Sequence, residues 1–394
     1  MKRTLVAGLI LGLAAGAVAQ ATTINAEIAG RVKAGDVYSY YAATPRPYPI
    51  GTGKRSVVWE DEIKSPGALW IRVHFTDFDL APGDFLTVSE PGGSAKTPKG
   101  HRYTGRGPHG SGDFWAFSVE GDTAIVRIYG GRRAGGGYTV TEVAHGTLPN
   151  EVPTPEVICG SDGRRNVACY TSPSPNIFRP IARLLFQSGG SSFVCTGWLA
   201  RGSNSSTMVT NNHCFDTQSE TNTVQARFNY QTTTCTGTTL AAASNYNGGT
   251  FLRTSPVTGG FDYTIFTLQG NPEATWGELI PTTVKPSAGS VMLFPQHPGG
   301  GAKRLGKYEN SGQTTLCDVT SINLTLSGTP SQSQFSYGCD SEGGSSGSPI
   351  MNSTGSRVWG LHHFGNVGGG CNNGATHMNR ICTDAGSLLQ CATN

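Results

Sequence analysis

The sequence predicts an all-β protein built from two successive β-rich domains. Charged residues make up only 14% of the 394 residues, while glycine alone occupies 55 positions. Short apolar runs alternate with Gly, Pro and Asp along most of the chain, which is typical of many short strands joined by turns. A helical apolar period is visible only in the last dozen residues. We therefore expect an N-terminal β-sandwich followed by a second all-β domain.

The first domain is expected over residues 24–145. Residues 68–75 alternate imperfectly between apolar and polar, as a half-buried strand does. Further strand-like runs at residues 84–88, 114–119, 123–128 and 138–141 have the spacing of a β-sandwich. Within residues 71–88, the strings Phe-Asp-Leu at 78–80 and Asp-Phe-Leu at 84–86 resemble a CUB-type domain.

A proline-rich connector is expected at residues 146–156, where three prolines stand in a stretch without apolar periodicity. The second domain then spans residues 157–394. Its strand-like runs lie at residues 193–199, 208–210, 264–268, 291–294 and 358–361. The connector and the pair Arg164 and Arg165 are accessible places for cleavage. The first domain is therefore either a removable pro-region or a retained module that binds substrate or a surface.

The chain begins as an exported protein does. A basic start, an apolar run over residues 5–17 and the small residues Ala17 and Ala19 predict a secretory signal peptide over residues 1–19. This run is too short to span a bilayer, and no later segment is long and apolar enough. The net charge of +3 is too small and too dispersed to indicate binding to nucleic acid.

The 10 cysteines agree with export, because all of them lie between Cys159 and Cys391. In an oxidising compartment this distribution predicts a disulfide-braced second domain behind a cysteine-free one. Zinc binding is disfavoured, because the sequence has no repeated Cys-x-x-Cys pair.

The string Gly-Gly-Ser-Ser-Gly-Ser-Pro at residues 343–349 is the strongest chemical signal. A serine hydroxyl needs a base and a site for the oxyanion before it can act as a nucleophile. Flanking glycines let the backbone turn tightly and present its N–H groups to a negative charge. Ser346 is therefore a candidate nucleophile, although the string alone is equally typical of a surface turn.

Two further strings supply a base and a carboxylate. His213 stands between a strand-like run and Cys214, and Asp262 precedes the apolar run at residues 264–268. A carboxylate orients an imidazole and stabilises its cation. A single histidine or aspartate is usually structural, but the chain order His, Asp, Ser is that of one branch of serine hydrolases. Together the strings predict a triad of His213, Asp262 and Ser346.

From Cys159 onward the sequence resembles the chymotrypsin-fold peptidases, specifically the bacterial lysyl and glutamyl endopeptidases. Besides the triad strings, the resemblance rests on Arg-Pro-Ile-Ala-Arg at 179–183, Gln-His-Pro-Gly-Gly at 296–300 and Leu-His-His-Phe-Gly at 361–365. It implies a chymotrypsin-like double β-barrel and a secreted, monomeric endopeptidase that acts on proteins or peptides. It also implies five disulfides: Cys159–Cys371, Cys169–Cys235, Cys195–Cys214, and the local pairs Cys317–Cys339 and Cys382–Cys391.

The implied chemistry is acyl transfer, which needs no metal or organic cofactor. His213 takes the proton of Ser346, and the N–H groups of Gly344 and Ser346 hold the oxyanion. Digestive relatives carry an Asp before the nucleophile that pairs with a freed N-terminus. Ser345 stands there in this chain, so activation through that ion pair is not expected.

The candidates for the specificity pocket disagree about the charge of P1, the residue preceding the scissile bond. Asp340 lies six residues before the nucleophile, the trypsin-like position for binding Lys or Arg. The lysyl branch takes its acidic residue from later in the chain, near Thr376 here, which is not acidic. His362 with Ser341 fits the glutamyl pattern instead. His363 completes the histidine pair, which faces opposite sides of a strand and so disfavours a shared metal. We expect a basic P1 residue, with Glu as the alternative.

Two rivals to a peptidase stay open. One is a non-catalytic binding protein that keeps the fold, and the other is a serine esterase or transferase with the same triad. Degenerate relatives usually lose a triad residue, and none is missing here, so the peptidase is favoured.

Overall fold

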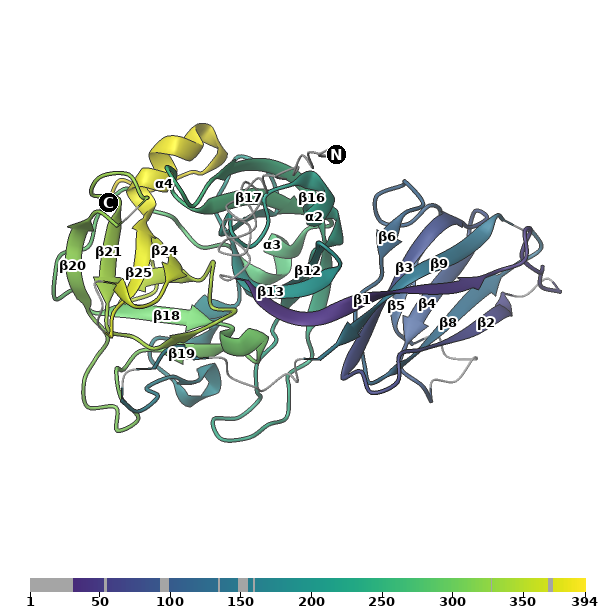
Figure 1. Cartoon of the computed structure of the whole chain (residues 1–394), viewed down its shortest axis with the longest axis horizontal. Coiled ribbons are helices and arrows are strands. Elements are labelled where there is room, and N and C mark those ends of the chain that lie inside the picture. The colour runs from purple at the N-terminus through teal and green to yellow at the C-terminus, as the bar shows by residue number, and fades with distance from the viewer. Residues whose placement is uncertain are drawn as a thin grey trace, which may run out of the picture.

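The computed structural model describes residues 31–52, 55–92, 99–133, 135–147, 155–158, 160–326, 328–367 and 371–394. The expected signal peptide, most of the expected connector (residues 148–154) and Cys159 lie outside this part of the chain. Two β-rich bodies are joined by one long strand, β1 (Val32–Ala43), which runs from the larger body into the smaller (Figure 1).

The smaller body is a sandwich of two antiparallel sheets. One sheet has the order β1–β9–β3, with β6 and β7 both pairing with β3, and the other has the order β2–β8–β4–β5. A buried apolar core fills the space between them. Besides β1, the strands are β2 (Ser56–Lys64), β3 (Trp70–Asp79), β4 (Phe85–Ser89), β5 (His101–Tyr103), β6 (Phe114–Trp115), β7 (Val119–Glu120), β8 (Thr123–Gly130) and β9 (Gly137–Gly146).

Strand β3 shows why its alternation in the sequence is imperfect. Ile71, Val73 and Phe75 point into the sandwich core, on one face of the strand. The opposite face is also buried, because Trp70 and Arg72 pack against the larger body instead of facing water. A strand covered on both faces has no fully polar side, which is what the sequence shows.

Two expected elements differ from the structure. The single strand expected at residues 114–119 is wrong, since the chain leaves the ladder between β6 and β7, where the Phe117 N–H donates to the Tyr103 hydroxyl (2.8 Å). The expected C-terminal helix lies earlier than predicted. Helix α4 (Met378–Ala385) ends at Gly386, whose φ of 59° suits a glycine that terminates a helix.

The larger body consists of a closed barrel and a half-barrel, both antiparallel. The first is a closed six-stranded barrel in the order β12–β15–β16–β17–β14–β13, completed by pairing of β12 with β13. The second sheet, β11–β19–β18–β23–β24–β25–β21–β20, curls into a half-barrel, and a bridge between Val291 and Asp318 brings its β20 edge back towards β18. The expected fold class, a β-sandwich followed by a chymotrypsin-like double β-barrel, is confirmed.

The strands of the first barrel are β12 (Ile181–Ser188), β13 (Ser191–Leu199), β14 (Thr207–Thr210), β15 (Gln225–Phe228), β16 (Ser244–Ser255) and β17 (Tyr263–Leu268). Those of the second are β11 (Arg165–Asn166), β18 (Met292–Gln296), β19 (Arg304–Gly306), β20 (Val319–Leu324), β21 (Gln334–Tyr337), β23 (Pro349–Asn352), β24 (Val358–Phe364) and β25 (Asn373–His377). Strands β10 (Pro155–Val157) and β22 (Ser341–Glu342) form a separate pair.

Helices are short and few in the described residues. The α-helices, besides α4, are α2 (Gln218–Thr223) and α3 (Pro272–Trp276). The 3₁₀ turns are η1 (Val167–Cys169), η2 (Pro175–Phe178), η3 (Pro298–Gly300) and η5 (Gly386–Leu388). Within the described ranges, no helix has the length and apolar character needed to cross a membrane.

The larger body contains disulfides, as the cysteine distribution predicts. Cys195–Cys214 joins β13 to the segment after β14 and closes a 19-residue separation, which in the chain-entropy account contributes about 3 kcal/mol. Cys371 is also disulfide-bonded, but its expected partner Cys159 lies outside the described residues. The other pairs are Cys169–Cys235, Cys317–Cys339 and Cys382–Cys391.

We predict that Phe75→Ala lowers the free energy of unfolding of the sandwich by about 3–5 kcal/mol, because it leaves a cavity in a close-packed core. The Phe75 ring is fully buried and contacts the rings of Phe78, Phe114 and Tyr138. Urea unfolding measures the change. Tyr41→Ala, at a side chain that is 81% exposed, is the control and should change stability little. Equal losses in both variants would contradict the assigned core.

Candidate active site

His213 is held at the end of β14 by the carboxylate of Asp262. The His213 Nδ1 atom lies 2.8 Å from Asp262 Oδ2, and the His213 backbone N–H donates to Oδ1 (3.0 Å). The disulfide from Cys214 to Cys195 ties the next residue to β13. Asp262 itself directly precedes β17, and its carbonyl accepts from the Asn211 side chain (2.8 Å). The imidazole therefore has one fixed orientation.

A second histidine approaches the same carboxylate from the other barrel. His363 Nδ1, on β24, lies 3.2 Å from Asp262 Oδ2. Although burial would raise the pKa of Asp262, the charge and hydrogen bond of His213, followed by those of His363, hold that pKa below its ordinary value. Asp262 is thus an anion in a site almost closed to water.

His363 was predicted as a residue of the specificity pocket, and in the structure its ring lies between Asp262 and Gln334. Its Nε2 atom lies 2.7 Å from Gln334 Oε1, so both ring nitrogens have partners. Burial lowers the pKa of His363, although the hydrogen bond with Asp262 opposes that shift. The only sequence signal for this contact is the strand period, which requires His362 and His363 to face opposite ways.

The loop that carries Ser346 is held by its carbonyl groups. Thr196, on β13 of the first barrel, donates its hydroxyl to the Gly344 carbonyl (2.8 Å) and its backbone N–H to the Ser346 carbonyl (2.9 Å). Gly299 N–H donates to the Gly343 carbonyl (2.6 Å). Three carbonyls are therefore directed towards donors, and the loop between β22 and β23 is fixed against the first barrel.

The N–H groups of Gly344 and Ser346 donate no hydrogen bond to any residue that the structure describes. Gly344 has a φ of 90°, and a side chain there would clash with the backbone of His297 and Gly300. Two unsatisfied N–H groups in a tight turn can hold a developing negative charge. This is the position in which an oxyanion site was predicted.

Ser346 Oγ and His213 Nε2 are both buried, and neither makes a hydrogen bond within the described part of the chain. The two atoms are therefore not bonded to each other. They belong to segments in direct contact, because a side chain on Gly347, next to Ser346, would clash with Thr196 and Thr210. Thr210 ends β14, three residues before His213.

The side chains predicted for the specificity pocket are all buried, but each has its own surroundings. Asp340 Oδ2 accepts from the Gly163 N–H (2.7 Å), and Ser341 donates to Asn373 Oδ1 (2.7 Å). His362 Nδ1 lies 2.6 Å from the Tyr337 hydroxyl, on the face of β24 opposite to His363.

Ser345, which stands in place of the aspartate of digestive enzymes, donates its hydroxyl to Gln296 Oε1 (2.6 Å). The Gln296 amide in turn donates to the Asp340 carbonyl (2.9 Å). The Ser345 hydroxyl is thus part of a neutral hydrogen-bonded chain. Among the described residues, no cluster of three or more His, Cys, Asp or Glu side chains could hold a metal ion.

A double β-barrel with a His–Asp pair on one barrel and a glycine-flanked serine loop on the other is the architecture of trypsin-like serine peptidases. The family described as lysyl endopeptidase, C-terminal domain, matches residues 161–380, more than half of the chain. The chain belongs to this family.

Individual relatives cover more of the chain. It is 29% identical over 391 residues to "Secreted RxLR effector protein 73" of Plasmopara viticola, with 93% of this chain and 91% of that protein covered. A Glu endopeptidase structure has 21% identity and a TM-score of 0.40, covering 58% of this chain and 96% of that one. The active form of the Rv3671c protease of M. tuberculosis has 15% identity and a TM-score of 0.41, covering 63% and 96%.

We predict that Asp262→Asn lowers the pKa of His363 further below its ordinary value. The amide carries no negative charge to stabilise the imidazolium, so the effect of burial is left unopposed. NMR titration of the histidine rings measures the shift. His109, whose pKa is lowered by its own burial, has no contact with Asp262 and serves as the internal control. A His363 pKa that rises in the variant would contradict the contact.

Proposed function

We propose that this protein is a serine endopeptidase in which Ser346 is the nucleophile, His213 the general base and Asp262 the residue that orients the base. The observation that carries the proposal is the His213–Asp262 pair, with a distance of 2.8 Å, beside a serine loop with two available N–H groups. Membership of the lysyl endopeptidase family supports the same chemistry.

The reaction is acyl transfer. His213 Nε2 takes the proton from Ser346 Oγ as the oxygen attacks the scissile carbonyl, and the N–H groups of Gly344 and Ser346 hold the oxyanion. His213 then gives the proton to the leaving amine. Water repeats the sequence and releases the acid. The buried Asp262 anion stabilises the imidazolium that forms in both halves.

The first proton transfer requires a hydrogen bond between Ser346 and His213, which these two side chains do not form in the structure. Catalytic hydrogen bonds are often long or poorly aligned without substrate and tighten in the Michaelis complex. The two atoms have no competing partner among the described residues, so forming this bond breaks no other side-chain hydrogen bond.

We predict that Ser346→Ala lowers kcat by about 10⁴-fold or more, because removal of the nucleophile abolishes the acyl-enzyme. Reaction with an organophosphonate, followed by mass spectrometry, should label Ser346 in the wild-type protein. Ser348→Ala is a matched control, since Ser348 is a buried serine of the same loop whose hydroxyl is also unpaired in the described structure. It should retain most activity and be labelled. Folded wild-type protein that is not labelled would favour the non-catalytic binding protein.

We further propose that P1 is Lys or Arg and that Asp340 recognises it. Asp340 is a fully buried carboxyl group, and its Oδ2 atom accepts a hydrogen bond from the Gly163 N–H (2.7 Å). Asp340 also acts on the nearby Glu309. Burial, followed by the charges of Asp318 and Asp340, raises the pKa of Glu309. Concentrated negative charge of this kind favours a cationic partner.

A Glu-specific endopeptidase is the second candidate, and one observation favours it. His362 is buried on β24 with its Nδ1 atom against the Tyr337 hydroxyl, and a histidine oriented in this way can bind a carboxylate. Asp340 and His362 therefore predict opposite charges for P1.

We predict that cuts in an unstructured protein, located by mass spectrometry, cluster after Lys and Arg. Asp340→Asn should lower kcat/KM for those sites by about 100-fold, because a buried ion pair loses one partner. His362→Gln is the matched comparison and should leave the preference unchanged. Cuts after Glu that are lost in His362→Gln would assign the specificity to the histidine instead.

We also propose that the protein is secreted after removal of residues 1–19. The proposal draws on the sequence of those residues, on the disulfides of the larger body and on the similarity to a protein named as a secreted effector. We likewise propose that the first domain is CUB-like and spans residues 24–145.

A further inference from the structure

The sandwich and the first barrel share a continuous sheet. The first residues of β1 pair with β13 of the barrel, with Val32 opposite Val194 and Lys33 opposite Phe193. From Gly35 onward β1 pairs with β9 of the sandwich, and Gly35 and Asp36 pair with both neighbours. In Figure 1, β1 is the purple strand that passes from one body to the other. Separating the two bodies would break a backbone ladder.

A buried apolar cluster reinforces this junction. Trp70 and Trp115 of the sandwich pack with Leu185 and Val194 of the barrel, and all four side chains are buried. If the sandwich dissociated, these apolar side chains would be exposed to water, which opposes dissociation.

Arg72 crosses the same junction with a buried charge. Its guanidinium donates to the carbonyl groups of Ala116 in the sandwich (2.8 Å) and of Leu185 (3.5 Å) and Thr223 (3.0 Å) in the barrel. Burial lowers the pKa of Arg72 to about 9. A buried arginine bonded to carbonyls on both sides requires both bodies to satisfy its donors.

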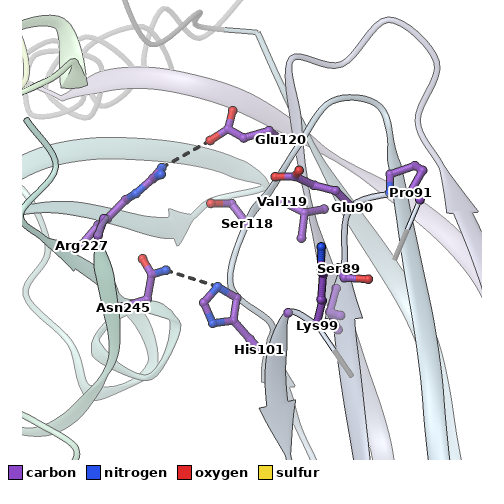
Figure 2. Close-up of a pocket in the computed structure, with 14 residues that line it drawn as sticks. Ser89, Glu90, Pro91, Lys99, His101, Ser118, Val119, Glu120, Arg227 and Asn245 are labelled. Atoms are coloured by element: carbon purple, nitrogen blue, oxygen red, sulfur yellow. Dashed lines mark hydrogen bonds and ion pairs between the residues drawn. The ribbon is translucent and has the colours of Figure 1, made fainter. Parts of the chain in front are cut away.

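Polar pairs hold the two bodies together around a cavity of about 420 Å³ (Figure 2). Glu120 of the sandwich and Arg227 of the barrel form an ion pair (3.3 Å). His101 Nε2 lies 3.2 Å from the Asn245 amide nitrogen, again across the junction. The contact between the bodies thus includes a ladder, an apolar cluster, a buried charge and polar pairs.

Arg31, immediately before β1, connects this junction to the active site. Its Nε donates to the His213 carbonyl (2.6 Å), and one terminal nitrogen donates to Ser188 Oγ (2.7 Å). The same nitrogen lies 3.4 Å from Glu220 Oε1. Glu220 in turn accepts from the Asp216 N–H through its other oxygen (3.1 Å).

We propose that Arg31 is a positioning residue for the catalytic base, and that the sandwich is retained in the working peptidase because it keeps Arg31 in place. The inference rests on the proposed function. The His213 backbone N–H is held by Asp262 and its carbonyl by Arg31, so its two backbone polar groups are held from opposite sides. Arg31 touches no reacting atom and acts only through the backbone of His213.

This assignment answers the question of whether the first domain is a removable pro-region or a retained module. Arg164 is buried and paired with Asp162 and Glu342, so the accessibility predicted for the Arg164 and Arg165 pair is wrong at Arg164. Cleavage in the connector would cut the chain after the sandwich, but β1 would stay paired with β13. Cleavage of the connector and release of the sandwich are therefore separate events. We infer that the sandwich stays bound to the barrel after the connector is cut.

The first experiment compares Arg31→Met, Arg31→Lys and the control Lys33→Met. Lys33 is a half-exposed cation on β1 that pairs with Asp36 on the same strand. For folded Arg31→Met we expect kcat about tenfold lower with KM within about twofold, because displacing the base impairs chemistry more than binding. Arg31→Lys should recover part of the loss, and Lys33→Met should match the wild type.

Phosphonate labelling of Ser346 separates the failure of this inference from that of the proposed function. Wild-type protein that is not labelled overturns the proposed function, and this inference with it. Labelled wild-type protein together with a folded Arg31→Met variant of unchanged kcat overturns the inference alone.

The second experiment does not depend on how the variants fold. A recognition sequence for a site-specific protease is placed within residues 148–154 of the full chain and cut in the folded protein. We expect the two fragments to co-elute in gel filtration with kcat unchanged. A barrel fragment that loses the sandwich and keeps the wild-type kcat would overturn the proposal.

Discussion

The buried Asp262 carboxylate is the interaction on which the arrangement of the site depends. It is 1% exposed, so its charge must be satisfied within the protein. It accepts from the side chain and backbone of His213 on the first barrel and from His363 on the second. Any shift of one barrel against the other would break one of the hydrogen bonds to this carboxylate. The proposed base and the junction of the barrels are thus stabilised by the same group.

Thr196 makes the reciprocal connection. It lies on β13 of the first barrel, and its hydroxyl and N–H hold carbonyls of the serine loop on the second. Its own carbonyl accepts from Thr210 (2.8 Å), at the end of the strand that leads to His213. One threonine therefore links the segment of the proposed base to the loop of the proposed nucleophile. The sandwich adds a third constraint through Arg31, which bonds the His213 carbonyl. The candidate active site is thus fixed by contacts among three β-rich units.

Much of the fold could be predicted, because strands leave a local signal. Runs at residues 193–199, 208–210 and 264–268 correspond to β13, β14 and β17, since apolar residues bounded by turn formers specify strands within a few positions. The run at residues 114–119 is not one strand, because its pairing with β3 shifts by one residue between Trp115 and Val119. The contact of His363 with Asp262 was missed, because it joins residues 101 positions apart and depends on how the barrels pack.

The sequence by itself determined the fold class, the candidate triad residues and their order, because strand periodicity and motif spacing are local properties of the chain. Only the tertiary structure decided which carboxylate both His213 and His363 share, which groups hold the serine loop, and that the sandwich pairs with the barrel through β1. These features depend on distances between residues far apart in the chain. Such distances exist only once the sheets have closed and packed, because burial then forces each polar group to find a partner.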